Sequence, residues 1–198
     1  LSLSINREAI FSSLEEKGLS IDILINNVGI GYWRYFQDTP WEKLEHIINT
    51  NVKCITHMTK LAIASMLERN SGHIVNLSST AAFIGSPNAV CYSATKAYIH
   101  IFSETLAMEL KNSGVKVLCV FPGATTTHFW EVALMTDSKY DKKVRKMTAE
   151  EVAKEIILAI KRGKSRLITG RKNKFSMLIA KFLPRELLNK VALKRFES

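Results

Sequence analysis

Tyr92 and Lys96 lie four residues apart in the segment VCYSATKAYIHIF, and Ser79 lies thirteen residues before the tyrosine. A phenol has a pKa near 10, so by itself it exchanges protons poorly at neutral pH. An ammonium one helical turn away favours the phenolate and lowers that pKa. A serine hydroxyl from a neighbouring strand end can then hold the oxygen of a carbonyl or an alcohol. These residue types at this spacing predict a site for proton transfer to or from such an oxygen.

The pattern of hydrophobicity predicts the strands that position these side chains. Short apolar runs alternate with longer segments of helical period, and the runs span residues 21–26, 72–78, 115–121 and 165–169. This alternation is typical of an α/β fold with a parallel sheet. The runs are almost continuously hydrophobic, which indicates that helices cover the sheet on both faces.

Helices are predicted between these strands, over 6–17, over about 28 residues from Thr39, over 92–112 and from Thr148 to Gly163. Thr39 and Thr148 are predicted as N-caps, each with a glutamate three residues later. The second helix has one polar residue, Asn51, in its apolar stripe, and a local break is expected there because bulges accompany functional positions. The helix over 92–112 is apolar on two sides, which predicts that a partner subunit covers one of them.

Small polar turns follow three of the predicted strands. They are Asn26-Asn27-Val28-Gly29, the turn at Ser79, and Pro122-Gly123 with Thr127. Ligands of open α/β sheets bind beyond the carboxyl ends of the strands, so these turns fall where a cofactor would lie. Each could be only a connection between elements, but their occurrence together with Tyr92 and Lys96 favours a functional site. A GxGxxG fingerprint is not complete, because Arg34 occupies the third glycine position.

Taken in order, these motifs resemble those of the short-chain dehydrogenase/reductase family. The stretch NNVG is similar to the family's NNAG, and PGATTT is similar to its PGxxxT element. Asn51 in NTNVK, Ser79 in NLSST and the pair Tyr92 and Lys96 in YSATK resemble the family's catalytic tetrad in order and spacing. The resemblance runs from about residue 1 to residue 163.

The resemblance implies a Rossmann-like, doubly wound parallel sheet in a three-layer αβα arrangement, and an NAD(P)-dependent oxidoreductase that interconverts ketones and secondary alcohols. It implies that Tyr92 is the general acid in reduction and the base in oxidation. Lys96 would lower the pKa of Tyr92 and bind the nicotinamide ribose, and Ser79 would orient the substrate oxygen. Asn51 would hold a water that links Lys96 to solvent.

The cofactor site implied by the resemblance uses the turns. Asn26 and Gly29 would contact the adenosine side, while Pro122, Gly123 and Thr127 would hold the nicotinamide, next to Tyr92 and Lys96. The cofactor is expected to be NADP or NAD, with NADP slightly favoured by the resemblance.

The family's first β-α-β unit, with its TGxxxGxG phosphate loop, has no counterpart in these 198 residues. Residues 1–170 are therefore expected to be the C-terminal larger part of a catalytic domain, followed by a basic amphipathic tail over 171–198. We expect these residues to be a portion of a longer protein. The alternative is a truncated product that binds cofactor poorly.

The excess of basic over acidic residues is confined to the C-terminal third of the chain. From residue 139 onward there are 18 basic and 6 acidic residues, whereas residues 1–138 carry 10 basic and 12 acidic ones. This distribution predicts a local anionic contact and argues against a nucleic-acid partner. The tail is predicted either to lie on an anionic membrane or to pack on the body with a solvated basic face. The sequence has no C-x-x-C pair and no histidines at metal-ligand spacing, so no metal site is expected. Cysteines without pairing motifs are typical of a reducing compartment, so the protein is expected to be cytoplasmic, or cytoplasmic and associated with a membrane.

Aromatic residues near the proposed site predict an apolar pocket for a lipid-like, aromatic or steroid-like carbonyl or alcohol. The aromatic residues are Trp33, Tyr35, Phe36, Phe83, Phe129 and Trp130, and Met135 adds to the apolar lining; packing of loops is the alternative explanation. Residues 124–147 are expected to order with substrate. The protein is expected to form a homo-oligomer, a dimer or a tetramer. The rival functions are a non-catalytic cofactor-sensing or scaffold protein of the same fold, and a membrane-associated lipid-binding module.

Overall fold

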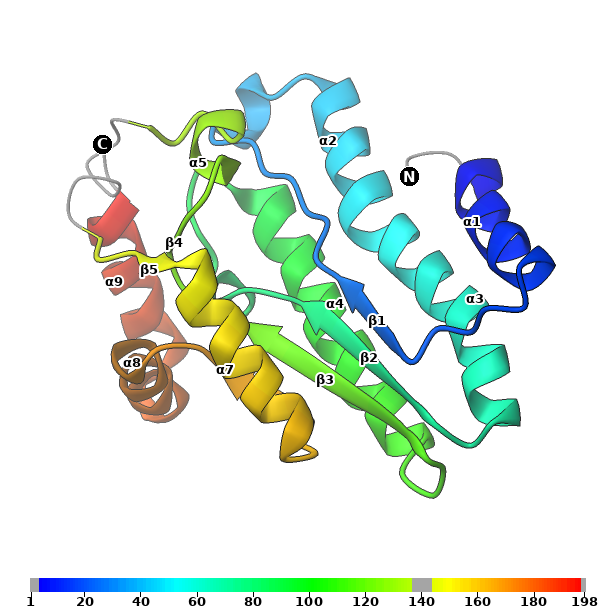
Figure 1. The fold of residues 1–198 in the computed structure, drawn as a ribbon. Helices are drawn as coiled ribbons and strands as arrows, with labels where there is room; N and C mark the ends of the chain where they lie inside the picture. The colour runs from blue at the N-terminus through cyan, green and yellow to red at the C-terminus, as the bar shows by residue number, and fades with distance from the viewer. Residues whose placement is uncertain (1–3, 137–143, 197–198) are drawn as a thin grey trace.

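A four-stranded parallel sheet lies at the centre of the computed structural model, which describes residues 4–136 and 144–196 (Figure 1). The strand order is β1-β2-β3-β6, with bounds Ile23–Asn26, Gly72–Leu77, Val115–Phe121 and Arg166–Ile168. All three neighbouring pairs are parallel, and Asn26 is in register with Asn76. Each strand falls within one of the apolar runs, so the predicted parallel sheet is confirmed.

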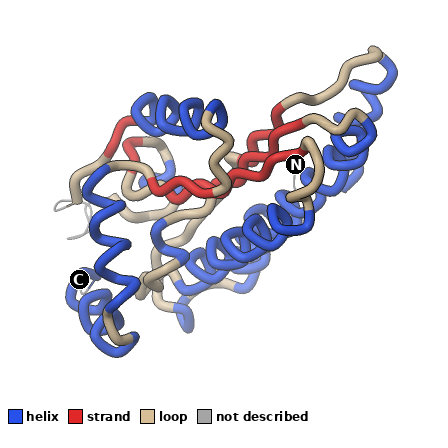
Figure 2. The backbone as a smooth tube through the Cα atoms, turned by 90° about the horizontal axis from the view of Figure 1, so that it is seen from below, coloured by secondary structure: helices blue, strands red, loops and turns tan. Residues whose placement is uncertain are grey.

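Helices lie on both faces of this sheet, as the view along its edge shows (Figure 2). On one face, α2, α3 and α4 follow one another and α1 packs against α3; their bounds are Trp41–Ile48, Ile55–Glu68, Val90–Glu109 and Ser4–Glu16. On the other face lies α7, Ala149–Lys161. Two apolar clusters fill the two interfaces, one around Met66 and Ile74 and the other around Leu118 and Ile156. The predicted three-layer, Rossmann-like arrangement is therefore confirmed.

The long helix predicted from Thr39 differs from expectation at its start. It begins at Trp41 with Pro40 as the N-cap residue, and no side chain caps it. The Thr39 hydroxyl instead donates to the carbonyl oxygen of Tyr35 at 2.9 Å, across the short 3₁₀ turn η1, Phe36–Asp38. The prediction of Thr39 as N-cap was wrong because this local turn already uses its hydroxyl.

The break predicted near Asn51 is present. A π-helical segment, η2, spans Asn49–Cys54 and joins α2 to α3. The capping box predicted at Thr148 is also present: its hydroxyl accepts from the Glu151 amide at 3.1 Å, and the Glu151 carboxylate accepts from the Thr148 amide at 2.8 Å. Local sequence signals therefore predicted both the break at Asn51 and the capping box at Thr148.

Short elements lie over the carboxyl ends of the strands. They are η3 Thr80–Ala82, the parallel pair β4 Thr125–Thr126 and β5 Met147–Thr148, and α5 Phe129–Val132. The predicted tail forms two helices, α8 Arg171–Phe182 and α9 Arg185–Phe196. Leu188 is buried, and the Arg185 guanidinium donates to the Phe83 carbonyl oxygen at 3.1 Å, so the tail packs against the body. None of the helices within 4–136 and 144–196 has the length and hydrophobicity to cross a membrane.

Candidate active site

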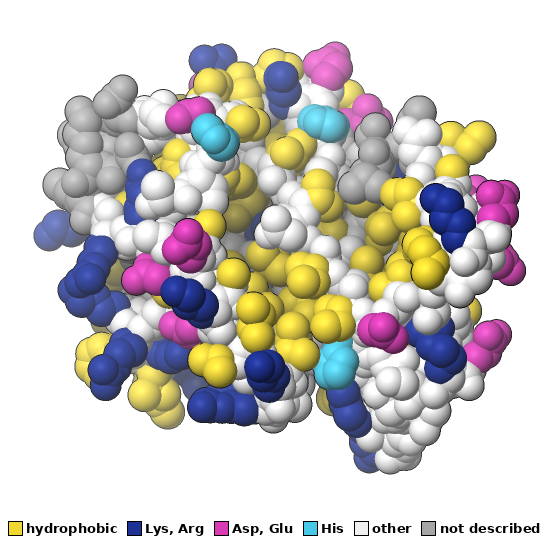
Figure 3. Space-filling model, in the orientation of Figure 1, with side chains coloured by type: hydrophobic (Ala, Val, Ile, Leu, Met, Phe, Trp, Pro, Cys, Tyr) yellow, Lys and Arg dark blue, Asp and Glu magenta, His cyan; other side chains and the backbone are white. Residues whose placement is uncertain are grey.

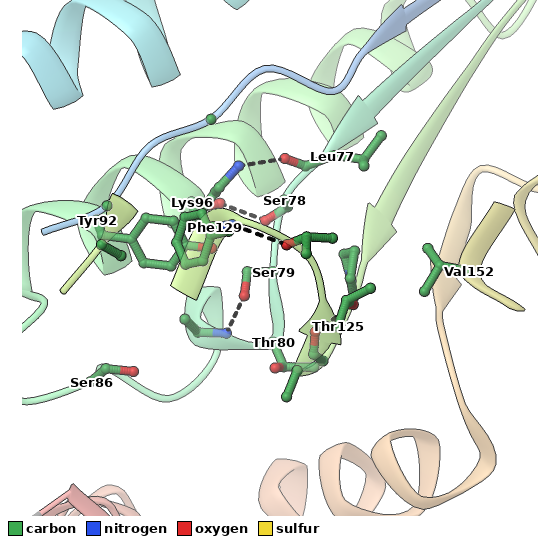
Figure 4. A pocket seen from close by; sticks show the side chains of 18 of the residues that line it. Leu77, Ser78, Ser79, Thr80, Ser86, Tyr92, Lys96, Thr125, Phe129 and Val152 are labelled. Carbon is green, nitrogen blue, oxygen red and sulfur yellow. Dashed lines mark hydrogen bonds between the residues drawn. The ribbon is translucent and has the colours of Figure 1, made fainter. Parts of the chain in front are cut away.

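A cavity of about 710 Å³ opens where strands β1, β2 and β3 end (Figure 4). Its walls include residues from each of the polar turns singled out in the sequence: Asn27, Gly29, Ser79, Pro122, Gly123 and Thr127. Tyr92 and Lys96 enter it from the first turns of α4. The parallel sheet brings the turns together because its strands all end at one edge.

Lys96 is almost completely buried, with 4% of its surface exposed. Its ammonium donates to the Leu77 carbonyl oxygen at 2.8 Å and lies 5.7 Å from the centre of the Tyr92 ring. Burial lowers the pKa of Lys96 from its ordinary 10.5 to about 8, because desolvation disfavours the charged form, while the nearby Cys119 thiol acts in the opposite direction. The amine therefore changes its protonation state close to physiological pH.

The Lys96 amine also explains why position 29 has no side chain. A Cβ added to Gly29 would lie 3.0 Å from Lys96 Nζ and 3.6 Å from the Asn51 amide oxygen. Gly31 is constrained in a similar way, since a Cβ there would lie 2.9 Å from the Phe129 ring. The glycines of this turn therefore leave room for the lysine and for the aromatic ring.

Ser79 lies at the end of β2, where it caps η3. Its Oγ accepts a hydrogen bond from the Ala81 amide at 3.1 Å. A hydroxyl that accepts from the backbone keeps its own proton to donate. Ser79 can therefore donate that proton to an oxygen atom in the cavity that it lines.

Tyr92 is half-buried in the first helical turn of α4. Its ring packs against Phe129 of α5, with ring centres 5.3 Å apart and planes inclined by 47° (Figure 4). Phe129 lines the same cavity. One side of the tyrosine ring thus lies against an apolar surface, which excludes water from that side.

Asn51 is fully buried in the π-helical segment and does not line the cavity. Its amide nitrogen donates to the Ile30 carbonyl oxygen at 2.9 Å and to Thr95 Oγ1 at 3.0 Å. Its amide oxygen accepts from the Ile30 amide at 2.9 Å. The side chain joins the turn after β1 to helix α4, which carries Tyr92 and Lys96. Its predicted water-holding role stays a prediction.

Asn26 does not reach the cavity with its side chain. Its amide nitrogen donates to Thr59 Oγ1 at 3.1 Å and to the Asn76 amide oxygen at 2.8 Å, all within the core. Asn27 lines the cavity instead. Side chains alternate between the two faces of a strand. The side chain of Asn26 points toward α3, and those of its neighbours Ile25 and Asn27 therefore point to the other face. The alternation places Asn26 and Asn27 on opposite faces, but which of them faces the cavity depends on where α3 packs.

Gly123 of the third turn lies against the tail. A Cβ added there would overlap the side chain of Asn173 in α8, whose amide nitrogen donates to the Thr169 carbonyl oxygen at 2.8 Å. Sequence reasoning also missed the apolar wall that helices α7, α8 and α9 contribute: Val152, Ile156, Ile157, Ile160, Met177, Val191 and Ala192. No local sequence signal predicts that the tail borders the cavity.

The predicted apolar lining is partly correct. Trp33, Phe129, Trp130 and Met135 line the cavity. The prediction was wrong for Tyr35 and Phe36, which are exposed, and for Phe83, whose ring packs on Phe121 with centres 4.8 Å apart. Of the segment expected to order with substrate, residues 137–143 lie outside the described residues. Among the residues described, no cluster of His, Cys, Asp or Glu could hold a metal ion.

Comparison with known proteins identifies the family of this chain. Residues 4–137 match the family model of short chain dehydrogenases. Among curated relatives, an uncharacterized oxidoreductase of Myxococcus xanthus is 35% identical over 111 residues, which are 56% of this chain and 44% of that protein. The very-long-chain 3-oxoacyl-CoA reductase of Anas platyrhynchos is 37% identical over 133 residues, which are 64% of this chain and 43% of that protein. The chain belongs to the short-chain dehydrogenase family, and its aligned part spans less than half the length of these two relatives.

Solved structures show the same architecture. The closed form of a serine dehydrogenase complexed with NADP+ superposes with a TM-score of 0.78 at 29% identity, covering 85% of this chain and 72% of the other. A short-chain dehydrogenase from Sphingobium yanoikuyae in complex with NADPH gives a TM-score of 0.79 at 26% identity, covering 91% and 70%. A 7β-hydroxysteroid dehydrogenase gives a TM-score of 0.80 at 25% identity, and the match covers 96% of this chain and 73% of the other.

Proposed function

We propose that this chain carries the catalytic residues of an NAD(P)-dependent oxidoreductase that interconverts a ketone and a secondary alcohol on an apolar molecule. The observation that supports the proposal most strongly is that Ser79, Tyr92 and Lys96 line one cavity at the carboxyl ends of a parallel sheet. In this proposal residues 1–170 form the larger part of a catalytic domain and 171–198 form a tail.

The cavity suits a nicotinamide cofactor in two respects. Gly29, Pro122 and Gly123 line it beyond the carboxyl ends of β1 and β3, where ligands of open α/β sheets bind. Lys96 Nζ has three N–H donors, and the one hydrogen bond at 2.8 Å to Leu77 leaves it able to bind a ribose hydroxyl. Gly29 would lie on the adenosine side, and Pro122, Gly123 and Thr127 would hold the nicotinamide. When bound, this cofactor supplies or accepts the hydride.

The proton chemistry falls to the chain's own residues. During reduction, Ser79 donates a hydrogen bond to the carbonyl oxygen and Tyr92 transfers its phenolic proton to that oxygen. The Lys96 ammonium, 5.7 Å from the ring centre, stabilises the phenolate that remains. In oxidation the same phenolate removes the alcohol proton. Asn51 acts indirectly, by holding the turn after β1 against α4.

The apolar residues that line the cavity favour one class of substrate. Trp33, Phe129 and Met135 on one side and Met177 and Val191 on the tail side are apolar. Such a lining favours a lipid-like or steroid-like carbonyl over a small polar one. Two relatives in the comparison are named as a very-long-chain 3-oxoacyl-CoA reductase and a 7β-hydroxysteroid dehydrogenase, which agrees with this choice. NADP is the favoured cofactor, since two of the similar structures hold NADP+ or NADPH.

We also propose a homo-oligomer, a dimer or a tetramer, formed through α4. This helix exposes Tyr98, Ile101 and Met108 at 41%, 61% and 65%. A partner subunit would cover this apolar side.

The test is Tyr92→Phe in the purified protein, assayed with NADPH and NADH against a panel of apolar ketones. Loss of the phenolic proton should lower kcat by about 10³-fold, the range of general acid catalysis. Cofactor binding, followed by nicotinamide fluorescence, should persist. The matched control is Tyr35→Phe, at a tyrosine that is 57% exposed and lies outside both the cavity lining and α4. Turnover that survives in Tyr92→Phe would contradict the proposal, and cofactor binding by the unaltered protein without turnover on any ketone would favour the scaffold function.

A further inference from the structure

Helix α8 carries a continuous apolar stripe on its outer side. Its members, spaced at i, i+3, i+4 and i+7, are Phe175, Leu178, Ile179 and Phe182, exposed at 65%, 56%, 44% and 77%. This spacing places all four on one face of the helix. Single exposed apolar residues are common, but a contiguous set of this size marks an interaction surface.

The opposite side of α8 is already docked on the body. Asn173 donates to the Thr169 carbonyl oxygen, and Met177 lines the cavity. Lys174 holds the helix in place through an ion pair of 3.0 Å with Glu155. The orientation of α8 is thus set by its inner contacts, and the apolar stripe faces outward as a consequence.

Basic side chains surround the stripe. Between residues 171 and 194 there are seven basic residues and one acidic residue. Lys172 and Lys181 belong to α8, and Lys190 and Lys194 to α9. Helix α9 also exposes apolar side chains, Leu187 at 44% and Leu193 at 50%. Figure 3 shows hydrophobic side chains interspersed with Lys and Arg at the lower left, over α8.

We propose that the outer surface of α8 and α9, here called the tail surface and defined by the stripe Phe175, Leu178, Ile179 and Phe182 with its basic rim, docks onto an anionic lipid bilayer. An apolar stripe between lysines is complementary to acyl chains beneath anionic headgroups. A second copy is a poorer partner, because it would bring two surfaces with the same strong positive charge together.

Docking in this way would lay the two helices along the bilayer surface, since each has only 12 residues, too few to span it. The same helices form a wall of the cavity through Met177, Val191 and Ala192. The tail surface therefore places that wall next to the lipid.

The experiment is co-sedimentation of the purified full chain with vesicles of phosphatidylcholine alone and of phosphatidylcholine with phosphatidylserine. We expect at least tenfold stronger partitioning into the anionic vesicles, weakened by added salt. The double variant Phe175→Ser with Phe182→Ser should lose about 100-fold in partitioning, because membrane affinity follows the apolar area that is buried. Lys172→Gln with Lys181→Gln should reduce the preference for phosphatidylserine.

The matched control is Trp41→Ser with Leu19→Ser, which makes the same chemical change at side chains exposed at 64% and 58% outside the tail. It should bind vesicles as the unaltered protein does. Far-UV circular dichroism and thermal melting verify that each variant is folded. The proposal is overturned if the unaltered protein ignores anionic vesicles or if the control variant loses as much binding. It is also overturned if the phenylalanine variant dissociates an oligomer in sedimentation velocity without vesicles, which would make the stripe an interface between copies.

Discussion

Replacing Lys96 with methionine should stabilise the fold at neutral pH. The lysine is 4% exposed, and its burial lowers its pKa from 10.5 to about 8. The charged amine is therefore held in the folded state at a cost in free energy. Methionine has a similar length and carries no charge, so it fills the same space without that cost.

The pKa shift sets the size and the pH window of this effect. Between pH 8 and pH 10.5 the unfolded chain binds more protons at Lys96 than the folded chain, so the stability of the unaltered protein rises with pH through that window. Lowering the pKa of Lys96 from 10.5 to about 8 corresponds to roughly 3 kcal/mol. At pH 7 the methionine variant should be more stable by about 2 kcal/mol, since the lost hydrogen bond to the Leu77 carbonyl oxygen offsets about 1 kcal/mol.

Urea unfolding without cofactor, measured at pH 7, 9 and 10.5, tests this reasoning. The stability of the variant relative to the unaltered protein should change by about 3 kcal/mol between pH 7 and pH 10.5, from a gain of about 2 kcal/mol to a loss of about 1 kcal/mol. Lys111→Met, at an exposed lysine just after α4, serves as the control and should show no such trend. Equal stabilities at pH 7, or a gain that does not vary with pH, would refute the idea that the amine is buried at a cost.

Three further changes probe the packing of the fold and the elements that surround the site. Gly114→Ala should lower the free energy of unfolding by about 3 kcal/mol or more, because its Cβ would overlap the backbone carbonyl of Asn70. Asn51→Ala should cost about 2–4 kcal/mol in thermal or urea unfolding, because a fully buried side chain loses its three hydrogen bonds. Thr148→Ala should cost about 1 kcal/mol, since it removes the capping bond to the Glu151 amide.

Each of these has a matched comparison. Gly85→Ala should be nearly neutral, because no atom lies within 4 Å of the Cβ it would add. Asn49→Ala lies in the same π-helical segment and should cost less than Asn51→Ala. Thr148→Ser keeps the hydroxyl and should retain most of the stability. Equal losses within any of these pairs would show that the named contact is not the cause.

The sequence by itself determined the elements and the spacing of the reactive groups. The apolar runs located all four strands of the central sheet, because a buried parallel strand is hydrophobic over its whole length. Spacing of four residues on a helix placed Tyr92 and Lys96 on one side of α4. A single asparagine in an apolar stripe indicated the π-helical break at Asn51. These signals are local, because each depends only on residues that are close together in the sequence.

Only the tertiary structure decided the environment of those groups. The choice between Asn26 and Asn27 for the cavity wall depended on which side of β1 faces α3. The lowered pKa of Lys96 depended on how deeply the strands and α4 bury its amine. The tail became a wall of the cavity through contacts such as that of Arg185 with Phe83, 102 residues apart in the chain. Burial and long-range contact are set by how all elements pack together, so no short stretch of sequence encodes them.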